Sequence, residues 1–285
     1  MTTELTIGAI NPGYGGLPIG VAAALGGAQL AWHAHPYRIP EYAGRTIMRY
    51  HHPHAGAYTV VDAPPPMVDV LTINGYDDWA VTGTSLIGAG YKPPLVIVEM
   101  QAARVGAREI HEYLNTRGYR TACRFVRACD VGAPHARHRT YVIAVRNDCD
   151  VPTVNAAHLD AANKVTSSWA TPSVDNAVLL ETACQWALDD DAGHPNQART
   201  RALEHWEKVT GERYPYPLYS VPTPETQGSL ALGFVEWMMG LPIGYVGHPD
   251  IDLDRDERLH LLQTGTVPLQ AAHAVATGLA RMAAS

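Results

Sequence analysis

A carboxylate at the end of an apolar run is the first side chain in this sequence that is placed to do chemistry. The run Leu95-Val-Ile-Val-Glu99 stays apolar up to its last residue, which is typical of a buried strand. Open α/β sheets bind their ligands beyond the carboxyl ends of such strands. A carboxyl group there can hydrogen-bond or protonate a ring nitrogen of a substrate. We prefer this interpretation of Glu99 to the alternative, an acid that begins the following helix.

Two arginines enter a later strand. They close the segment Asp130-Val-Gly-Ala-Pro-His-Ala-Arg137-His-Arg139, and alternation in an extended chain places Arg137 and Arg139 on one face. Two fixed guanidinium groups beside a turn suit a phosphate or a base as a substrate. The alternative is a solvated pair of charges.

A glycine-rich turn follows the first apolar run. Gly13-Tyr-Gly15-Gly16 comes directly after the strand expected at residues 5–10, where α/β folds let a nucleotide-like cofactor approach the backbone. A tight turn between a strand and a helix explains the same residues equally well.

Histidines gather in a short part of the chain. His33 and His35 share one face of an expected strand, and His51, His52 and His54 follow in a turn. Imidazoles at these spacings can meet at one metal ion. We prefer the alternative, in which the strand pair is partly buried and the others form a surface turn, and we assign no metal ligands.

Short apolar strands alternate with helices through the first half of the chain. Strands are expected at residues 5–10, 29–32, 59–61, 68–73, 95–99, 122–128 and 141–145, with helices at 17–25, 39–50 and 108–117. This alternation predicts an α/β fold with a doubly wound, Rossmann-like, mainly parallel sheet. We place this domain at residues 1–146, a small irregular region at 147–228, and a helical C-terminal segment that returns to the first domain at 229–285.

The amino-acid composition excludes several classes of protein. The 285 residues are 46% hydrophobic with a formal net charge of −7, which supports a folded core and tells against loose adhesion to DNA, though not against one basic face. The four cysteines have no Cys-x-x-Cys spacing, which argues against a zinc ribbon or a disulfide framework. The sequence has no apolar run of membrane-spanning length and no signal peptide, so we expect a cytoplasmic protein that does not bind membranes.

Taken in order, six segments resemble the DNA cytosine-5 methyltransferases, especially the short phage and actinobacterial type. Residues 10–17 (Ile-Asn-Pro-Gly-Tyr-Gly-Gly-Leu) look like the family's Phe-x-Gly-x-Gly-Gly motif, and residues 68–72 like the strand before its catalytic Pro-Cys loop. Residues 98–100 stand where Glu-Asn-Val is expected, and residues 130–144 resemble the Gln-x-Arg-x-Arg region. Residues 234–242 and 264–271 resemble the last two motifs. The resemblance implies the class I methyltransferase fold, S-adenosylmethionine or a derivative as cofactor, DNA as substrate, and a bacterial or phage-infected cell as the location.

The resemblance also implies specific sites. Enzymes of this family add a cysteine thiolate to C6 of a flipped cytosine and then methylate C5; by ungapped counting the cysteine's position holds Asp77, and a slip of one residue gives Asp78. The catalytic set is therefore Asp77, Glu99, Arg137 and Arg139. The cofactor set is Asn11, Gly13, Gly15, Gly16, His35, Asp62 and Thr264, in which Asn11 replaces an aromatic residue, His35 the ribose-binding acid and Thr264 an asparagine.

Three functions are compatible with these departures. The first is an S-adenosylmethionine-dependent enzyme that modifies a flipped cytosine by chemistry that needs no cysteine. The second is an inactive homologue that serves as a DNA-binding or regulatory subunit. The third is a DNA-base modifying enzyme with a different cofactor. We favour an enzyme that binds DNA. A further protein or a second copy of the chain is the other partner that we consider.

Overall fold

The computed structural model describes residues 4–35, 43–59, 65–75, 84–101, 104–159, 197–215 and 230–285. The chain divides into two compact units, each built from separate segments. The first comprises Met1–Val126, His138–Asp160 and Gly265–Ser285, and the second comprises Arg127–Arg137 and Ala161–Thr264. The domain boundaries expected after residues 146 and 228 stay a prediction.

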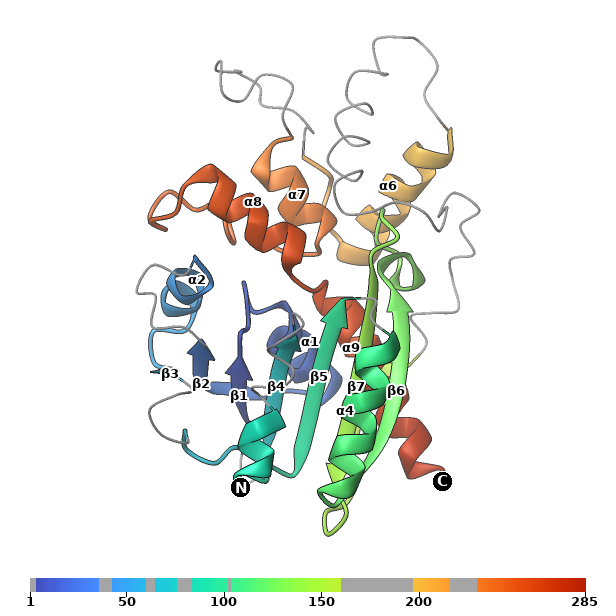
Figure 1. The fold of residues 1–285 in the computed structure, drawn as a ribbon. Helices are drawn as coiled ribbons and strands as arrows, with labels where there is room; N and C mark the ends of the chain where they lie inside the picture. Colours follow the sequence, from blue (N-terminus) through green and yellow to red (C-terminus); the bar gives the residue numbers. More distant parts are fainter. Residues whose placement is uncertain are drawn as a thin grey trace. The chain divides into compact units, whose positions relative to one another are not determined.

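The first unit is built around a seven-stranded sheet (Figure 1). Its strands are β1 (Thr6–Ile10), β2 (Gln29–His35), β3 (Gly56–Thr59), β4 (Val70–Gly75), β5 (Leu95–Gln101), β6 (Tyr119–Arg127) and β7 (His138–Arg146). Their order is β3-β2-β1-β4-β5-β7-β6. The pairs from β3 to β5 are parallel, whereas β7 runs antiparallel to β5. This mixed, mainly parallel sheet confirms the α/β fold expected from the sequence.

Helices cover both faces of this sheet, as Figure 1 shows, with α4 in front and with α1 and α9 behind. Their bounds are α1 (Gly16–Ala24), α2 (Ala43–His51), α4 (Arg104–Thr116) and α9 (Pro268–Ala283), and a short helix, η2, spans Ala156–His158. On the α4 face, Ile110 and Leu114 join a buried cluster with Val96, Val98 and Val142 of the central strands. Side chains of a strand alternate between faces, so Glu99 belongs to the opposite face.

The last helix packs against the first. A Cβ atom at Gly20 of α1 would collide with the carbonyl oxygen of Pro268 and lie 2.6 Å from the Cβ of Ala271. Only glycine lets the two helices approach this closely. α9 therefore packs within the first unit, whereas the expected C-terminal segment at residues 229–285 stays a prediction.

The described part of the second unit is helical. It contains the short helix η1 (Ala128–Val131), α6 (Gln197–Thr210), α7 (Leu232–Met238) and α8 (Arg255–Thr264). Trp206 of α6 is fully buried and its indole N–H donates to the carbonyl oxygen of Trp237 at 2.7 Å. Among the described residues, no helix meets the length and apolarity that a membrane span requires.

Candidate functional site

The turn after β1 has the backbone conformation of a ligand-binding loop. Gly13 and Gly15 adopt positive φ angles of 57° and 95°, and Asn11 adopts 51°. Asn11 is the one described residue other than glycine with a positive φ, which asparagine tolerates better than most residues. Its backbone N–H donates to Ala34 at 2.8 Å and its side-chain amide donates to the carbonyl oxygen of Asn74 at 3.3 Å. Asn11 therefore ties together the carboxyl ends of β1, β2 and β4.

Tyr14 anchors this turn to the segment before α9. Its side chain is fully buried and its hydroxyl donates to the carbonyl oxygen of Thr266 at 2.6 Å. Gly265 lies against the ring of Tyr14, and a Cβ atom at Gly16 would strike the carbonyl oxygen of Thr266. Tyr14 was not among the site residues predicted from the sequence, although an aromatic residue between glycines is a recognisable signal.

The turn fits the approach of a cofactor. No described atom lies within 4 Å of a Cβ built on Gly13, so the backbone there faces open space. Gly16 begins α1 at the same place, and the N-terminus of a helix carries a partial positive charge. The turn thus combines an accessible backbone at Gly13 with the N-terminus of a helix.

Glu99 and Arg139 form a buried ion pair. Arg139 Nε lies 2.5 Å from Glu99 Oε1, and the two side chains are 2% and 4% exposed. The register of β5 and β7 pairs Glu99 with Tyr141 and Gln101 with Arg139, which makes Glu99 and Arg139 diagonal neighbours on one face. Arg139 also donates from Nη2 to the carbonyl oxygen of Gly265 at 3.2 Å. Arg139 therefore orients the carboxylate at the carboxyl end of β5.

Arg137 and Thr264 fall in the second unit. Arg137 Nη1 donates to the carbonyl oxygen of Leu262 at 3.0 Å and lies 3.3 Å from the sulfur of Met239. The Thr264 hydroxyl donates to the carbonyl oxygen of His260 within α8 at 2.8 Å. Arg139 and Glu99 thus belong to the same unit and form an ion pair, whereas Arg137 belongs to the second unit. The roles of Arg137 in substrate binding and of Thr264 in cofactor binding stay predictions.

Two buried histidines occupy the end of β2. His33 Nδ1 and His35 Nε2 lie 3.1 Å apart, and the side chains are 0% and 1% exposed. Burial, together with the positive charges of Arg45 and Arg49, lowers the pKa of His33 to about 4. Burial and the neighbouring His33 lower the pKa of His35 to about 3. Both rings are therefore neutral at physiological pH. The described residues contain no cluster of three or more residues that could hold a metal ion.

We expect this pair to make the protein acid-sensitive. The folded pKa values of about 4 and about 3 lie below the ordinary value of 6.5, so the unfolded chain binds more protons as the pH falls below 6.5. The free energy of unfolding should be highest above pH 6.5 and fall, as the pH drops toward 4, by up to about 1.4 kcal/mol per pH unit for each histidine. Urea titrations at several pH values measure this slope.

A matched pair of variants isolates the contribution. His33→Gln should reduce the dependence of the unfolding free energy on acid pH by the contribution of up to one proton. His54→Gln changes an exposed residue and should leave this dependence unchanged. Equal slopes in His33→Gln and the wild-type protein would contradict the assignment.

Two members of the predicted sites, Asp62 and Asp77, lie outside the described residues. The described cysteines are Cys123, Cys129 and Cys149. None of the three lies in the segment directly after β4, where the resemblance expects the catalytic cysteine. Burial raises the pKa of the Cys123 and Cys129 thiols, which opposes formation of a thiolate nucleophile.

Glu236 of α7 is a second buried polar residue that was not predicted from the sequence. Its side chain is 1% exposed and accepts three backbone hydrogen bonds, from Gly244, Val246 and Gly247 at 2.6–2.7 Å. A carboxylate that satisfies three amides fixes the loop after α7. The signal was an acid inside an otherwise apolar helix.

One part of the sequence is similar to a known protein family. Residues 101–220 match the family described as C-5 cytosine-specific DNA methylase. No curated protein sequence matches the chain.

Solved methyltransferases share the fold. The S. pombe Dnmt2 methyltransferase is similar with a TM-score of 0.60 and 11% identity, covering 98% of this chain and 99% of that chain. The Entamoeba histolytica methyltransferase EhMeth gives 0.56 and 13%, with 95% and 97% covered. A candidate DNA modification methyltransferase encoded within an E. coli prophage gives 0.53 and 12%, with 99% and 100% covered. The chain is therefore similar to the C-5 cytosine-specific DNA methylases over residues 101–220 and shares the fold of these solved methyltransferases.

Proposed function

We propose that this chain is a DNA-modifying enzyme that uses S-adenosylmethionine or a derivative and acts on a flipped cytosine without a cysteine nucleophile. The observation that carries the proposal is the buried ion pair between Glu99 and Arg139. A buried pair of charges costs free energy in desolvation, and here it lies at the carboxyl end of a sheet strand, where α/β folds bind ligands. The glycine turn at residues 13–16 belongs to the same unit.

The cofactor would be held by residues at the carboxyl ends of β1 and β2. The open backbone at Gly13 would receive the amino-acid end, with Gly15 beside it in the turn, and Asp62 would contact the adenine. His35 stands where relatives use an acid for the ribose, and a neutral imidazole offers a single hydrogen bond to a hydroxyl where a carboxylate accepts two. When bound, S-adenosylmethionine supplies an activated methyl group.

The side chains of the chain itself would bind and orient the base. The Glu99 carboxyl group would face the Watson–Crick edge of the cytosine and hydrogen-bond to its ring nitrogen, with Arg139 fixing its orientation. Arg137 would contact the base carbonyl or the DNA backbone. Asp77 would accept a proton or orient water beside the ring, because a carboxylate is a poor nucleophile toward C6.

One observation favours other functions. His33 and His35 are a neutral pair, so if His35 contacts the ribose as the resemblance implies, the bidentate acceptor for the diol is lost. This change is compatible with an inactive homologue that binds DNA or a partner subunit, and with a DNA-base modifying enzyme that uses a different cofactor.

The test restores the family's nucleophile. We expect the wild-type protein, with labelled S-adenosylmethionine, to add mass to DNA, as read by nucleoside mass spectrometry. Asp77→Cys should gain 5-methylcytosine formation and trap a covalent adduct with DNA that contains 5-fluorocytosine. Adding Glu99→Gln to that variant should abolish the gain while leaving DNA binding largely intact.

Asp78→Cys is tested beside it, because a slip of one residue in the count places the catalytic position there. If both cysteine variants are inert and the wild-type protein leaves the mass of DNA unchanged, the enzyme proposal is wrong and the inactive homologue stands. If the mass of DNA increases in reactions from which S-adenosylmethionine is left out, and not in those that contain it, the enzyme uses a different cofactor.

A further inference from the structure

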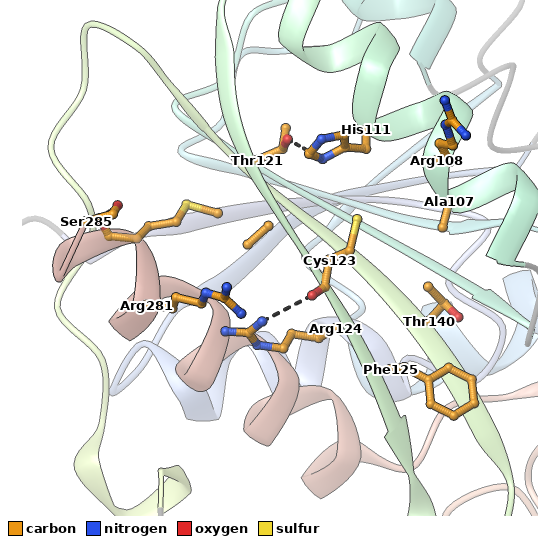
Figure 2. A pocket seen from close by; sticks show the side chains of 12 residues that line it. Ala107, Arg108, His111, Thr121, Cys123, Arg124, Phe125, Thr140, Arg281 and Ser285 are labelled. Carbon is orange, nitrogen blue, oxygen red and sulfur yellow. Dashed lines mark hydrogen bonds between the residues drawn. The ribbon is translucent and has the colours of Figure 1, made fainter.

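The outer edge of β6 lies in a groove of the first unit. β6 is the last strand in the order of the sheet, and within the described part of the chain β7 is its only neighbour. Residues 121–125 of β6 line a cavity of about 640 Å³ together with residues of α4, β7 and the end of α9 (Figure 2). We call this cavity the β6 groove. Its lining consists of Ala107, Arg108, His111, Thr121, Ala122, Cys123, Arg124, Phe125, Thr140, Arg281, Met282 and Ser285.

Side chains of β6 leave the strand toward both walls of this groove. The Thr121 hydroxyl lies 2.6 Å from Nδ1 of His111, which belongs to α4. Arg124 instead donates to the carbonyl oxygen of Thr277 in α9 at 2.9 Å. Because the side chains of a strand alternate, the odd-numbered residues face α4 and the even-numbered residues face α9. A ligand that fills the groove must present groups to both faces of the sheet, as an extended strand does.

The hydrogen bonds between β6 and β7 show which backbone groups point outward. At one end of β6, the backbone N–H of Asn147 donates to Gly118, and at the other end the N–H of Ala128 donates to Arg137. The two bonds share a single antiparallel register. In this register the even-numbered residues of β6 bond to β7, and the odd-numbered residues turn their N–H and C=O groups to the outer edge.

Thr121 and Cys123 are two of these outward residues, and both line the groove. Among the described residues, their outward backbone groups have one partner, the Arg124 Nη1 that donates to the carbonyl oxygen of Cys123 at 3.2 Å. Donors and acceptors thus alternate along the edge, which is a template for another strand. A nucleic-acid backbone offers phosphate acceptors without matching donors, so a peptide backbone fits this edge better.

The charged side chains that line the groove are all cationic. They are Arg108, Arg124 and Arg281, and no aspartate or glutamate is among the lining residues. Arg124 and Arg281 direct their guanidinium groups toward one another (Figure 2), and neither forms an ion pair with a carboxylate of the described chain. Burial and the neighbouring Arg281 lower the pKa of Arg124. Acidic side chains next to this pair would relieve the repulsion between the two arginines.

The α4 side of the groove is less charged and more apolar. Arg108 already pairs with Glu112 there at 2.8 Å. Phe125 is 42% exposed, and Ala107 adds further apolar surface. The α9 side therefore favours acids and the α4 side favours apolar groups. A peptide with alternating acidic and apolar residues matches both sides, because its side chains alternate with the same period as those of β6.

A second copy of β6 matches this edge poorly. The strand carries Arg120, Arg124 and Arg127 and has no acidic residue. Pairing of two such edges would bring like charges together, which is how many proteins prevent association between sheet edges. The same arginines attract an acidic strand, so charge complementarity selects the kind of partner.

We propose that the outer edge of β6 binds an extended acidic segment of a partner protein as an additional strand. The backbone of this segment pairs with the edge at Thr121 and Cys123. Its acidic side chains lie against Arg124 and Arg281, and the alternate apolar side chains lie toward Phe125. None of the catalytic or cofactor residues discussed above lines the groove, so this site does not depend on the function proposed above.

Calorimetry on the full chain tests the charge preference with the end-blocked peptide Glu-Val-Glu-Val-Glu-Val-Glu. We expect this peptide to bind, and its counterpart with lysine in place of glutamate not to bind. Arg281→Gln should weaken binding by about threefold to fivefold, as for one exposed ion pair. Arg281 is exposed, so the variant should fold, which thermal unfolding checks. Arg117→Gln removes an exposed charge outside the groove and should bind as the wild-type protein does.

A proline at the edge tests the backbone pairing. Cys123→Pro removes an outward N–H and keeps the bonds to β7, as prolines on edge strands do, so it should weaken binding by about tenfold. Cys123→Ala keeps the N–H and should bind normally. Methylating alternate amide nitrogens of the peptide gives the same test without changing the protein. One set of methylated positions should abolish binding, and the other set should leave it intact.

Several results would overturn the proposal. They are no peptide binding at millimolar concentration, equal binding by Arg281→Gln and Arg117→Gln, and equal binding of the two methylated peptides. Binding of a DNA oligonucleotide that depends on Arg281, without binding of the peptide, would assign the groove to nucleic acid instead. A dimer of the full chain that Cys123→Pro dissociates would assign the edge to a second copy.

Discussion

Replacing Arg139 with methionine should lower the free energy of unfolding by about 3–5 kcal/mol, the usual cost of leaving a buried charge without its partner. The substitution keeps most of the side-chain volume but leaves the Glu99 carboxylate, which is 4% exposed, in an environment that no longer stabilises its charge. It also removes the donor to Gly265, which precedes α9. Urea denaturation monitored by circular dichroism measures the change.

Two further variants separate the ion pair from simple packing. Glu99→Gln combined with Arg139→Met removes both charges, and the double variant should recover much of the lost free energy. Arg108→Met breaks the exposed pair with Glu112 and should leave stability nearly unchanged. If Arg139→Met costs no more than Arg108→Met, the buried pair does not have the energetic role described here.

A methyl group at Gly16 should be nearly as damaging. Alanine ordinarily stabilises a helix relative to glycine by about 1 kcal/mol, but at Gly16 the new Cβ would strike the carbonyl oxygen of Thr266 and lie 2.8 Å from the ring of Tyr14. Because the carbonyl belongs to the backbone, the segment before α9 must shift. We expect Gly16→Ala to lower the free energy of unfolding by about 2–3 kcal/mol and to weaken S-adenosylmethionine binding.

Gly106→Ala in α4 is the opposing control. There the nearest atom to a new Cβ is the sulfur of Met100 at 3.7 Å, an ordinary contact, so helix propensity should raise stability by about 0.5–1 kcal/mol. The two substitutions are chemically identical and should differ in sign. A neutral or stabilising effect of Gly16→Ala would show that the turn is not held against Thr266.

The local sequence pattern predicted which candidate site residues lie near the carboxyl ends of strands. The apolar run before Glu99 predicted a buried strand with an acid at its carboxyl end, and β5 is such a strand. Alternation also placed His33 and His35 on one face, and their rings do meet. Pattern could not show that both histidines stay neutral, because that depends on burial and on Arg45 and Arg49 from the next helix.

The expected partnership of Arg137 and Arg139 shows where local pattern stops. Alternation assumed that both residues lie in one extended strand, but β7 begins at His138. Before it, the chain forms a short helix and turns at Gly132, whose φ is 94°. Where a strand begins depends on its neighbours in the sheet, and a periodic pattern does not contain that information. Tyr14 was missed for a related reason, since its partner Thr266 lies 252 residues away.

That distance has a consequence for how the protein is made. The hydroxyl of Tyr14 and the backbone at Gly16 are held by Thr266, which the ribosome adds at least 250 positions later. During synthesis, α1 therefore emerges with the face that will meet α9 exposed to solvent. Contacts of such long range slow folding and leave partly folded chains open to aggregation. The glycine turn gains its final geometry only after translation has passed α9, so a ribosome stalled before residue 265 carries a sheet whose glycine turn is still unanchored.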